Sequence, residues 1–181
     1  MASFTGCILI DSRTSGAWLP RQLAAVAGNG DDGQASFTIV VADDTGDSRL
    51  PDLVSRFGAR LTICPAAPLG ARLNAAILDC TGDVLLLPMA RRVPSHDRLT
   101  RLAAGVANQT YDAAVLPMGR TSLIARLLSR LRRSTPKDAL CVSRDWFERI
   151  GGFDPELEND APTELIERLH ACGARVETLE P

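Results

Sequence analysis

Residues 36–64 read SFTIVVADDTGDSRLPDLVSRFGARLTIC, and this stretch decides the fold. The apolar, β-branched run over 36–42 predicts a buried strand, and ARLTIC over 59–64 predicts a second one. Between them, a polar turn leads into a helical stretch over 50–58, whose first turn holds Pro51, a residue favoured there. A strand, a helix and a strand joined by short connections are typical of a βαβ unit with parallel strands.

The same alternation continues on both sides of this unit. Strands are predicted at 6–11, 83–87, 112–116, 138–143 and 174–179, and helices at 16–28, 69–81, 95–108, 121–133, 144–150 and 160–172. Because strands and helices alternate, we predict an α/β fold. It is a three-layer α/β/α sandwich with a mostly parallel sheet, formed by a single domain over 1–181.

The carboxyl ends of the predicted parallel strands mark the candidate site, because ligands of open α/β sheets bind there. Five segments follow these strand ends: 11–16, 43–47, 65–74, 88–94 and 117–121. We therefore expect functional side chains in these five segments.

Length and composition exclude several classes of protein. The chain has 181 residues, 45% of them hydrophobic, and a formal net charge of -2. A net charge near zero is not typical of a nucleic-acid-binding protein, because such proteins are usually strongly basic. The longest apolar run, over 84–90, is far shorter than the roughly 18 residues of a membrane span, and the first residues lack the basic segment of a secretory signal. We expect a soluble, cytoplasmic protein with no nucleic-acid partner.

The cysteines do not form a recognisable pattern. There are five of them, widely spaced and without a C-x-x-C motif: Cys7, Cys64, Cys80, Cys141 and Cys172. This spacing predicts neither a disulfide framework nor a zinc site, so we expect thiols that pack as small hydrophobic groups.

Three segments, in order, resemble the family 2 glycosyltransferases of the GT-A fold. They are TIVVADDTGD over 38–47, GARLNAAILDCTGDVLLLPMARRVP over 70–94, and a segment over 141–176 that contains VSRDWFERIGGFDPEL. The resemblance spans most of the chain. It implies the nucleotide-sugar-binding fold of that family and transfer of a glycosyl group from a nucleotide diphosphate-sugar to an acceptor.

The resemblance also implies residues for nucleotide binding. Asp43 and Asp44 occupy the family's turn, where a carboxylate accepts a hydrogen bond from the base or ribose, and Arg72 and Asn74 match positions near the nucleotide. An arginine at a helix start could grip phosphate, aided by the helix N-terminus. Two other interpretations remain open: the two aspartates supply turn and cap oxygens, and Arg72 is an exposed first-turn residue.

The family's metal-binding motif is absent. Pro88, Met89 and Ala90 fall on the Asp-x-Asp that holds Mg²⁺ or Mn²⁺ in the family, and their side chains offer no oxygen ligands. We therefore predict no metal and no other cofactor. Arg91 and Arg92 follow directly and either grip the diphosphate in place of the metal or solvate a loop.

The family's catalytic base is also replaced. Its acidic pair falls on Ala161 and Pro162, which leaves Asp160 as the candidate base and Glu158 as a second one. Asp160 is also well placed as a helix N-cap, with Pro162 in the first turn, and the sequence favours this interpretation.

Two hypotheses for function follow. The first is a nucleotide-sugar-dependent transferase with impaired or metal-independent transfer. The second is a non-catalytic homologue that acts as a nucleotide-binding or protein-interaction module. Loss of both carboxylate motifs favours the second hypothesis, because each motif contributes strongly to transfer.

Two oppositely charged segments bear on partners. Residues 120–137 carry six basic residues and no acidic one, whereas 145–181 carry ten acidic residues and three arginines. The amphipathic basic helix over 121–133 either packs on the core or makes a peripheral membrane contact. The opposite charges also fit a contact within one chain or across a homodimer.

Overall fold

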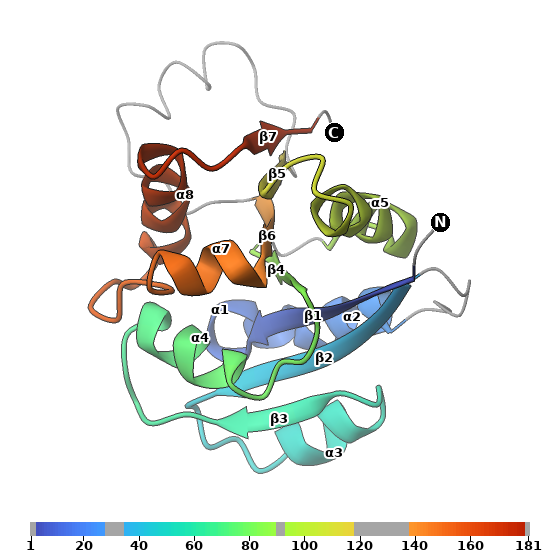
Figure 1. Ribbon diagram of the computed structural model, residues 1–181. Coiled ribbons are helices and arrows are strands. Elements are labelled where there is room, and N and C mark those ends of the chain that lie inside the picture. The colour runs from blue at the N-terminus through green and yellow to red at the C-terminus, as the bar shows by residue number, and fades with distance from the viewer. Residues whose placement is uncertain (1–2, 28–34, 90–92, 118–137, 180–181) are drawn as a thin grey trace, which may run out of the picture.

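The structure is a computed structural model that describes residues 3–27, 35–89, 93–117 and 138–179 (Figure 1). Within these residues, seven strands form one sheet in the order β3-β2-β1-β4-β6-β5-β7. Their bounds are β1 Phe4–Asp11, β2 Ala35–Asp43, β3 Arg60–Ile63, β4 Val84–Pro88, β5 Ala113–Pro117, β6 Asp138–Ser143 and β7 Val176–Thr178.

The sheet is mostly parallel, as predicted. Strand β1 pairs in parallel with β2 and β4, β2 with β3, and β5 with β7, whereas β6 runs antiparallel to both β4 and β5. The β1–β2 register pairs Asp11 with Ala42. The polar residues that end β1 and β2 therefore lie at the same edge of the sheet.

Helices cover both faces of the sheet and complete the three layers (Figure 1). Their bounds are α1 Ser12–Ser15, η1 Gly16–Trp18, α2 Leu19–Val26, α3 Leu50–Ser55, α4 Leu69–Ile77, α5 His96–Ala107, α7 Arg144–Arg149 and α8 Ala161–Ala171. Helices α2, α3 and α5 contribute to one core cluster, and α4, α7 and α8 contribute to the other. The predicted α/β/α sandwich is thus confirmed.

The core follows the alternation of side chains along the central strands. On β1, Cys7 and Leu9 belong to the cluster under α4, α7 and α8, while Ile8 and Ile10 belong to the opposite cluster. All four are at most 2% exposed. A continuous apolar run is what a strand buried on both faces requires.

One predicted helix begins later than expected, and another falls outside the described residues. The segment predicted as one helix over 16–28 forms η1 followed by α2. A further short helix, α1, precedes it directly after β1, because the Asp11 side chain caps α1 by accepting a hydrogen bond from the Thr14 N–H at 2.8 Å. The basic helix predicted over 121–133 lies outside the described residues.

The cysteine prediction is wrong for one pair. Cys7 in β1 and Cys80, just after α4, form a disulfide across 73 residues of sequence. Their sequence spacing carries no signal because the fold, rather than the local chain, brings these segments together. Among the other cysteines, Cys64 and Cys141 are buried thiols and Cys172 is exposed.

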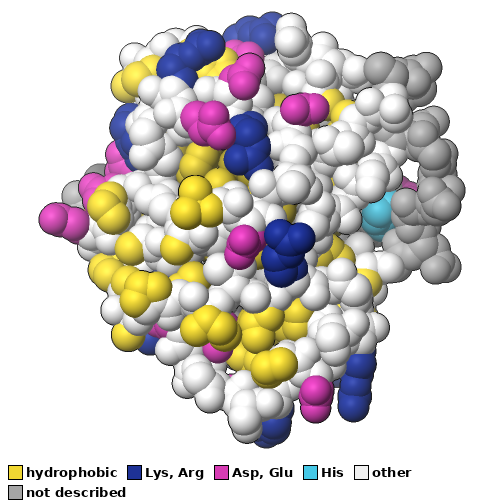
Figure 2. Space-filling model, turned by 60° about the horizontal axis from the view of Figure 1, so that its bottom comes forward, with side chains coloured by type: hydrophobic (Ala, Val, Ile, Leu, Met, Phe, Trp, Pro, Cys, Tyr) yellow, Lys and Arg dark blue, Asp and Glu magenta, His cyan; other side chains and the backbone are white. Residues whose placement is uncertain are grey.

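The surface around the β3 edge contains both hydrophobic and charged side chains (Figure 2). Figure 2 brings this end of the molecule forward and shows hydrophobic side chains with acidic and basic ones among them. Ile63 of β3 and Leu78, just after α4, are 70% and 86% exposed. Across the residues described, every helix is too short or too polar to cross a bilayer.

Candidate functional site

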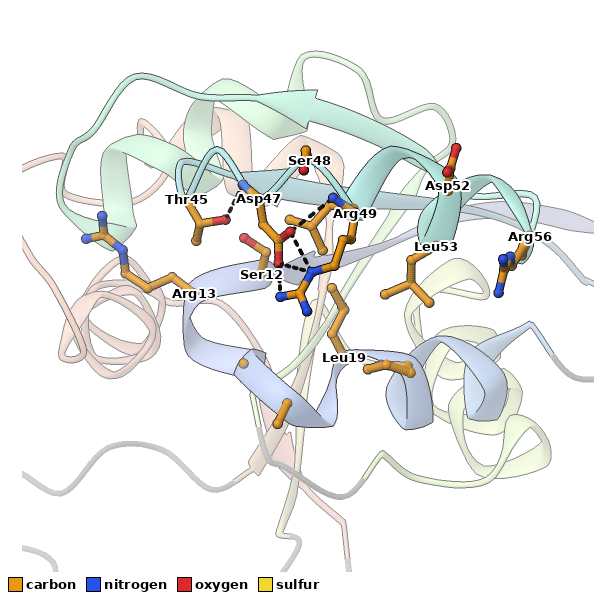
Figure 3. A pocket seen from close by; sticks show the side chains of 14 residues that line it. Ser12, Arg13, Leu19, Thr45, Asp47, Ser48, Arg49, Asp52, Leu53 and Arg56 are labelled. Carbon is orange, nitrogen blue, oxygen red and sulfur yellow. Dashed lines mark hydrogen bonds and ion pairs between the residues drawn. The ribbon is translucent and has the colours of Figure 1, made fainter.

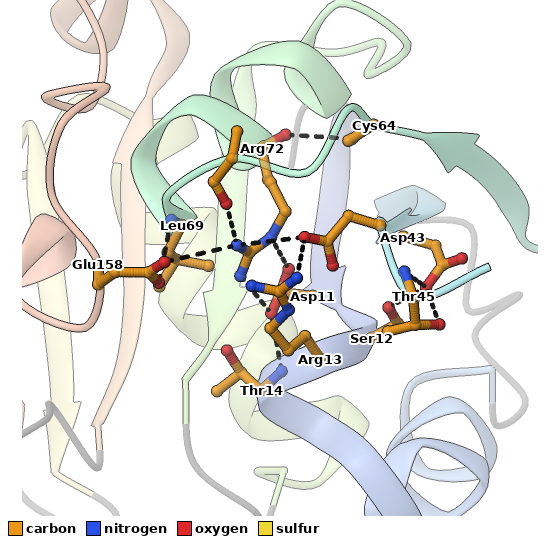
Figure 4. Close-up of polar contacts among 12 residues, drawn as sticks. Asp11, Ser12, Arg13, Thr14, Asp43, Thr45, Cys64, Leu69, Arg72 and Glu158 are labelled. Carbon is orange, nitrogen blue, oxygen red and sulfur yellow. Dashed lines mark hydrogen bonds and ion pairs between the residues drawn. The ribbon is translucent and has the colours of Figure 1, made fainter. Parts of the chain in front are cut away.

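A polar cluster lies where β1 and β2 end, close to the start of α4 (Figure 4). It contains three aspartates, Asp11, Asp43 and Asp44, and the arginines Arg13 and Arg72. Three of the predicted site residues, Asp43, Asp44 and Arg72, are therefore brought together. The cluster draws its side chains from three of the five segments expected at the carboxyl ends of the strands: 11–16, 43–47 and 65–74.

Asp43 is buried, and its carboxylate is held by Ser12 and by the turn that follows it. One carboxylate oxygen accepts hydrogen bonds from the Ser12 hydroxyl at 2.5 Å and from the Thr45 hydroxyl at 2.7 Å and N–H at 3.1 Å, and the other accepts from the Gly46 N–H at 3.3 Å. Burial would raise the pKa of Asp43, but these hydrogen bonds outweigh it and lower the pKa below its usual value. The turn-forming interpretation therefore describes how this carboxylate is held in the structure.

Asp11 joins β1 to α4. Its carboxylate accepts from the Arg72 Nε at 2.9 Å and from an Arg72 terminal nitrogen at 3.2 Å, while also capping α1 through Thr14. Two-pronged contacts of this kind fix both the position and the orientation of a guanidinium. The sequence marked 11–16 as polar, but no motif identified Asp11 as the partner of Arg72.

Arg72 is the centre of the cluster and is only 1% exposed. Besides Asp11, its guanidinium lies 3.6 Å from Asp44 and 4.0 Å from Glu158, and it donates a short hydrogen bond to the Ala67 carbonyl. Burial would lower the pKa of Arg72, but the nearby carboxylates outweigh it and raise the pKa. The interpretation of Arg72 as an exposed first-turn residue is wrong, because these acceptors draw it into the protein.

Asp44 lies between two guanidinium groups. Its side chain is fully buried, with one oxygen 2.6 Å from an Arg13 terminal nitrogen and 3.6 Å from Arg72. The Arg13 side chain is 49% exposed, so it extends from the buried carboxylate of Asp44 to the solvent. Sequence reasoning did not single out Arg13, because the 11–16 segment carries no recognisable motif.

The N-terminus of α4 is closed by the loop before α8. The Leu69 N–H donates to the Glu158 carboxylate at 3.3 Å, and the Gly70 N–H donates to the Leu157 carbonyl at 2.9 Å. A Cβ on Gly70 would lie 1.9 Å from the Asp154 carbonyl oxygen, which shows how closely the loop packs. These two N–H groups of the helix N-terminus therefore bind protein acceptors.

Asn74 is directed elsewhere. Its amide donates to the Phe153 carbonyl at 2.8 Å and accepts from the Phe153 N–H at 3.0 Å. The residue ties α4 to the turn after α7, where Gly152 has a φ of 74°. The structure thus places Asn74 in a structural contact, apart from the polar contacts of the aspartate cluster.

Asp160 precedes α8, as the capping interpretation predicts, but its side chain makes no capping hydrogen bond. Ala161 and Pro162, at the positions of the family's acidic pair, are both buried. Glu164 forms a 2.6 Å ion pair with Arg168 on the same helix. Of the two candidate bases, Glu158 is the one that reaches the cluster, through Arg72.

The end of β4 offers no metal ligands in the part that is described. Pro88 is buried and pairs in register with Ala139, and Met89 is half-buried against the core. Ala90, Arg91 and Arg92 lie outside the described residues. The nearby aspartates are already engaged by arginines and hydrogen-bond donors, and the described part holds no group of three His, Cys, Asp or Glu suited to a metal. The described side chains at the end of β4 therefore do not fit a divalent cation.

A cleft of about 890 Å³ opens beside the cluster, between the start of α2 and the loop that leads into α3 (Figure 3). Ser12, Arg13 and Thr45 line it on the side of the cluster. Leu19 and Leu53 supply an apolar wall. Arg13 therefore belongs both to the polar cluster and to the lining of the cleft.

The opposite side of the cleft carries two more arginines. Arg49 is held by Asp47 through hydrogen bonds of 2.7 to 3.2 Å, which lower the pKa of Asp47 to about 2. Arg56 also lines the cleft and forms no ion pair with the residues that the structure describes.

No protein-family model matches the sequence, and no curated protein matches it either. Solved structures do match. The mannosyltransferase PcManGT from Pyrobaculum calidifontis, in complex with GDP-Man and Mn²⁺, is 16% identical with a TM-score of 0.69, covering 99% of this chain and 56% of its own. S. aureus TarS, in complex with UDP-GlcNAc, is 15% identical with a TM-score of 0.69, covering 98% of this chain and 56% of its own.

A third match is glucosyl-3-phosphoglycerate synthase from Mycobacterium tuberculosis, in complex with Mn²⁺, UDP and phosphoglyceric acid. It is 16% identical with a TM-score of 0.70, covering 98% of this chain and 68% of its own. The chain thus has the fold of GT-A glycosyltransferases, and it spans about 56% of the length of the first two matches. The expected resemblance in fold is confirmed.

Proposed function

We propose that this chain binds a nucleotide diphosphate-sugar at the cluster of Asp43, Asp44 and Arg72, without the aid of a divalent metal. One observation carries the proposal: these residues meet at the strand ends of a fold whose solved examples include complexes with GDP-Man, UDP-GlcNAc and UDP. Carboxylates accept hydrogen bonds from the N–H groups of a base or the hydroxyls of a ribose.

Arginines would supply the positive charge that a diphosphate needs. The residues proposed for the diphosphate end are Arg91 and Arg92. A guanidinium can grip phosphate oxygens with two parallel N–H bonds, so binding need not involve a metal.

We propose that any glycosyl transfer is slow, with Asp160 as the base. A carboxylate that deprotonates an acceptor hydroxyl must be free to take the proton. Asp160 makes no capping hydrogen bond, whereas Glu158 is engaged with Leu69 and lies near Arg72. The buried Ala161 and Pro162 at the family's acidic positions favour the alternative, a non-catalytic protein that binds the nucleotide only.

Binding is tested by isothermal titration calorimetry with UDP, GDP and their sugars, in EDTA and in Mn²⁺. We expect similar affinity in both buffers, and Asp44→Asn should weaken binding. Asp47→Asn, in the same turn, is the matched control and should leave the affinity unchanged. Binding that appears only with Mn²⁺ contradicts the metal-free proposal, and absence of binding to every nucleotide contradicts the site itself.

Turnover is tested separately by measuring sugar release from each donor. A slow rate that Asp160→Asn abolishes supports a transferase. No release above the buffer rate, together with measured binding, favours the non-catalytic alternative.

A further inference from the structure

The Asp44 carboxylate is buried and contacts a half-exposed arginine of its own chain. Its side chain has no exposed surface, and its closest cation is Arg13 at 2.6 Å. A buried carboxylate is stable only when it is paired, so Arg13 stabilises the closed arrangement of the free protein.

The two arginines that face Asp44 differ in how firmly they are held. Arg72 is 1% exposed and is anchored by Asp11 and the Ala67 carbonyl. Arg13 is 49% exposed on its side chain, and its sole ion pair to a described residue is the one with Asp44. Of the two, Arg13 is the side chain that can leave.

The surroundings provide space for that movement. Arg13 belongs to α1, a helix of four residues, and it lines the cleft of about 890 Å³ between α2 and α3. Rotation of the side chain would expose the carboxylate of Asp44 without moving β1 or β2. Figure 3 shows Arg13 at one end of this cleft, and Figure 4 shows it among the residues of the cluster.

We infer that Arg13 is an autoinhibitory gate: its guanidinium occupies the Asp44 carboxylate, and a nucleotide must displace it into the cleft to bind. The inference rests on the proposed nucleotide site and adds its regulation. Affinity for a ligand falls in proportion to the fraction of protein in the open state. Removing Arg13 should therefore tighten nucleotide binding, although it removes a cation from the binding region.

The test compares Arg13→Ala with the wild type by calorimetry, using UDP and GDP at one fixed salt concentration. We expect Kd to fall by about 3- to 10-fold in Arg13→Ala, the range that a modest closed-state bias produces. Arg56→Ala is the matched control, because it removes an arginine of the same cleft that is not paired with Asp44. It should leave Kd unchanged.

The outcomes separate this inference from the proposed function. If the wild type binds the nucleotide and Arg13→Ala binds it with the same or a higher Kd, the gate is overturned but the proposed nucleotide site is not. Failure of both proteins to bind overturns both proposals, whereas binding by Arg13→Ala alone supports both.

A second measurement guards against misfolding of the alanine variant. In the folded wild type, NMR of the Arg13 guanidinium should show hindered rotation that becomes free when UDP or GDP saturates the site. If rotation of the Arg13 guanidinium stays hindered in the saturated complex, the gate is overturned, whatever the affinity of Arg13→Ala.

Discussion

The Nε of Arg72 lies 2.9 Å from Oδ1 of Asp11, and the two side chains are 1% and 4% exposed. This ion pair connects the end of β1 to the first turns of α4, across the layer boundary between sheet and helix. A buried pair of this kind costs much free energy to desolvate, and breaking it leaves the remaining charge without a partner.

Arg72→Met should therefore destabilise the fold strongly. Asp11 would be left buried and Asp44 would lose one of its two cations, which predicts a loss of about 3–5 kcal/mol in the free energy of unfolding. Urea denaturation measures it. Arg60→Met is the control, because Arg60 and Asp79 form an exposed 4.0 Å contact. Equal losses of unfolding free energy in the two variants would show that the buried ion pair contributes no more to stability than the exposed one.

Stability should fall in acid through Asp43. Its pKa is lowered in the folded protein, because hydrogen bonds from Ser12, Thr45 and Gly46 outweigh burial. A lowered pKa contributes stability that is fully present above the unfolded pKa, near 3.8, and is lost as pH falls through the folded pKa. Urea denaturation between neutral pH and strong acid should show this decline.

The matched variant for this prediction is Asp43→Asn. It should be less stable than the wild type at neutral pH and should show a smaller decline in acid. An identical pH profile in the two proteins would assign the acid sensitivity to other carboxylates.

Gly70→Ala should destabilise the contact between α4 and the loop before α8. The added Cβ would lie 1.9 Å from the backbone oxygen of Asp154, a group that cannot swing aside. We expect a loss of about 1–3 kcal/mol, typical of overpacking, measured by urea denaturation. The backbone amide hydrogen of residue 70 should also exchange faster in the variant, because the added Cβ would strain its hydrogen bond to the Leu157 carbonyl. A neutral substitution with an unchanged amide rate would contradict this packing.

Non-reducing peptide mapping should recover a Cys7–Cys80 cross-link. Disulfides of natural proteins contribute about 2–4 kcal/mol, so Cys80→Ala should lower the free energy of unfolding by that order. Without denaturant, alkylation should modify Cys172, which is exposed, but not Cys141, which is buried. Free thiols at Cys7 and Cys80 in protein purified without reductant would contradict the bond.

Local patterns were enough to predict the layers of the fold. The run over 36–42 is strand-like by composition, and Pro51 marks a helix start, so both segments carry their own signal. The same patterns predicted that Asp43 and Arg72 lie at one edge of the sheet, because the carboxyl ends of parallel strands lie at the same edge.

What the sequence left open depends on pairings between distant residues. Nothing in the spacing of Arg13 and Asp44, or of Cys7 and Cys80, indicates that they touch. The burial of Arg72 in α4 also depends on Asp11, which lies at the end of β1 and has no motif around it. Such contacts follow from the assembled sheet, not from local periodicity.

Both outer strands of the sheet are short: β3 has four residues and β7 has three. An outer strand presents unpaired N–H and C=O groups, and long, flat ones recruit other chains and aggregate. These two strands offer few such groups, and Arg60 adds a charge to β3. The molecule should therefore resist edge-to-edge association into fibres, even though the apolar side chain of Ile63 is exposed at the β3 edge.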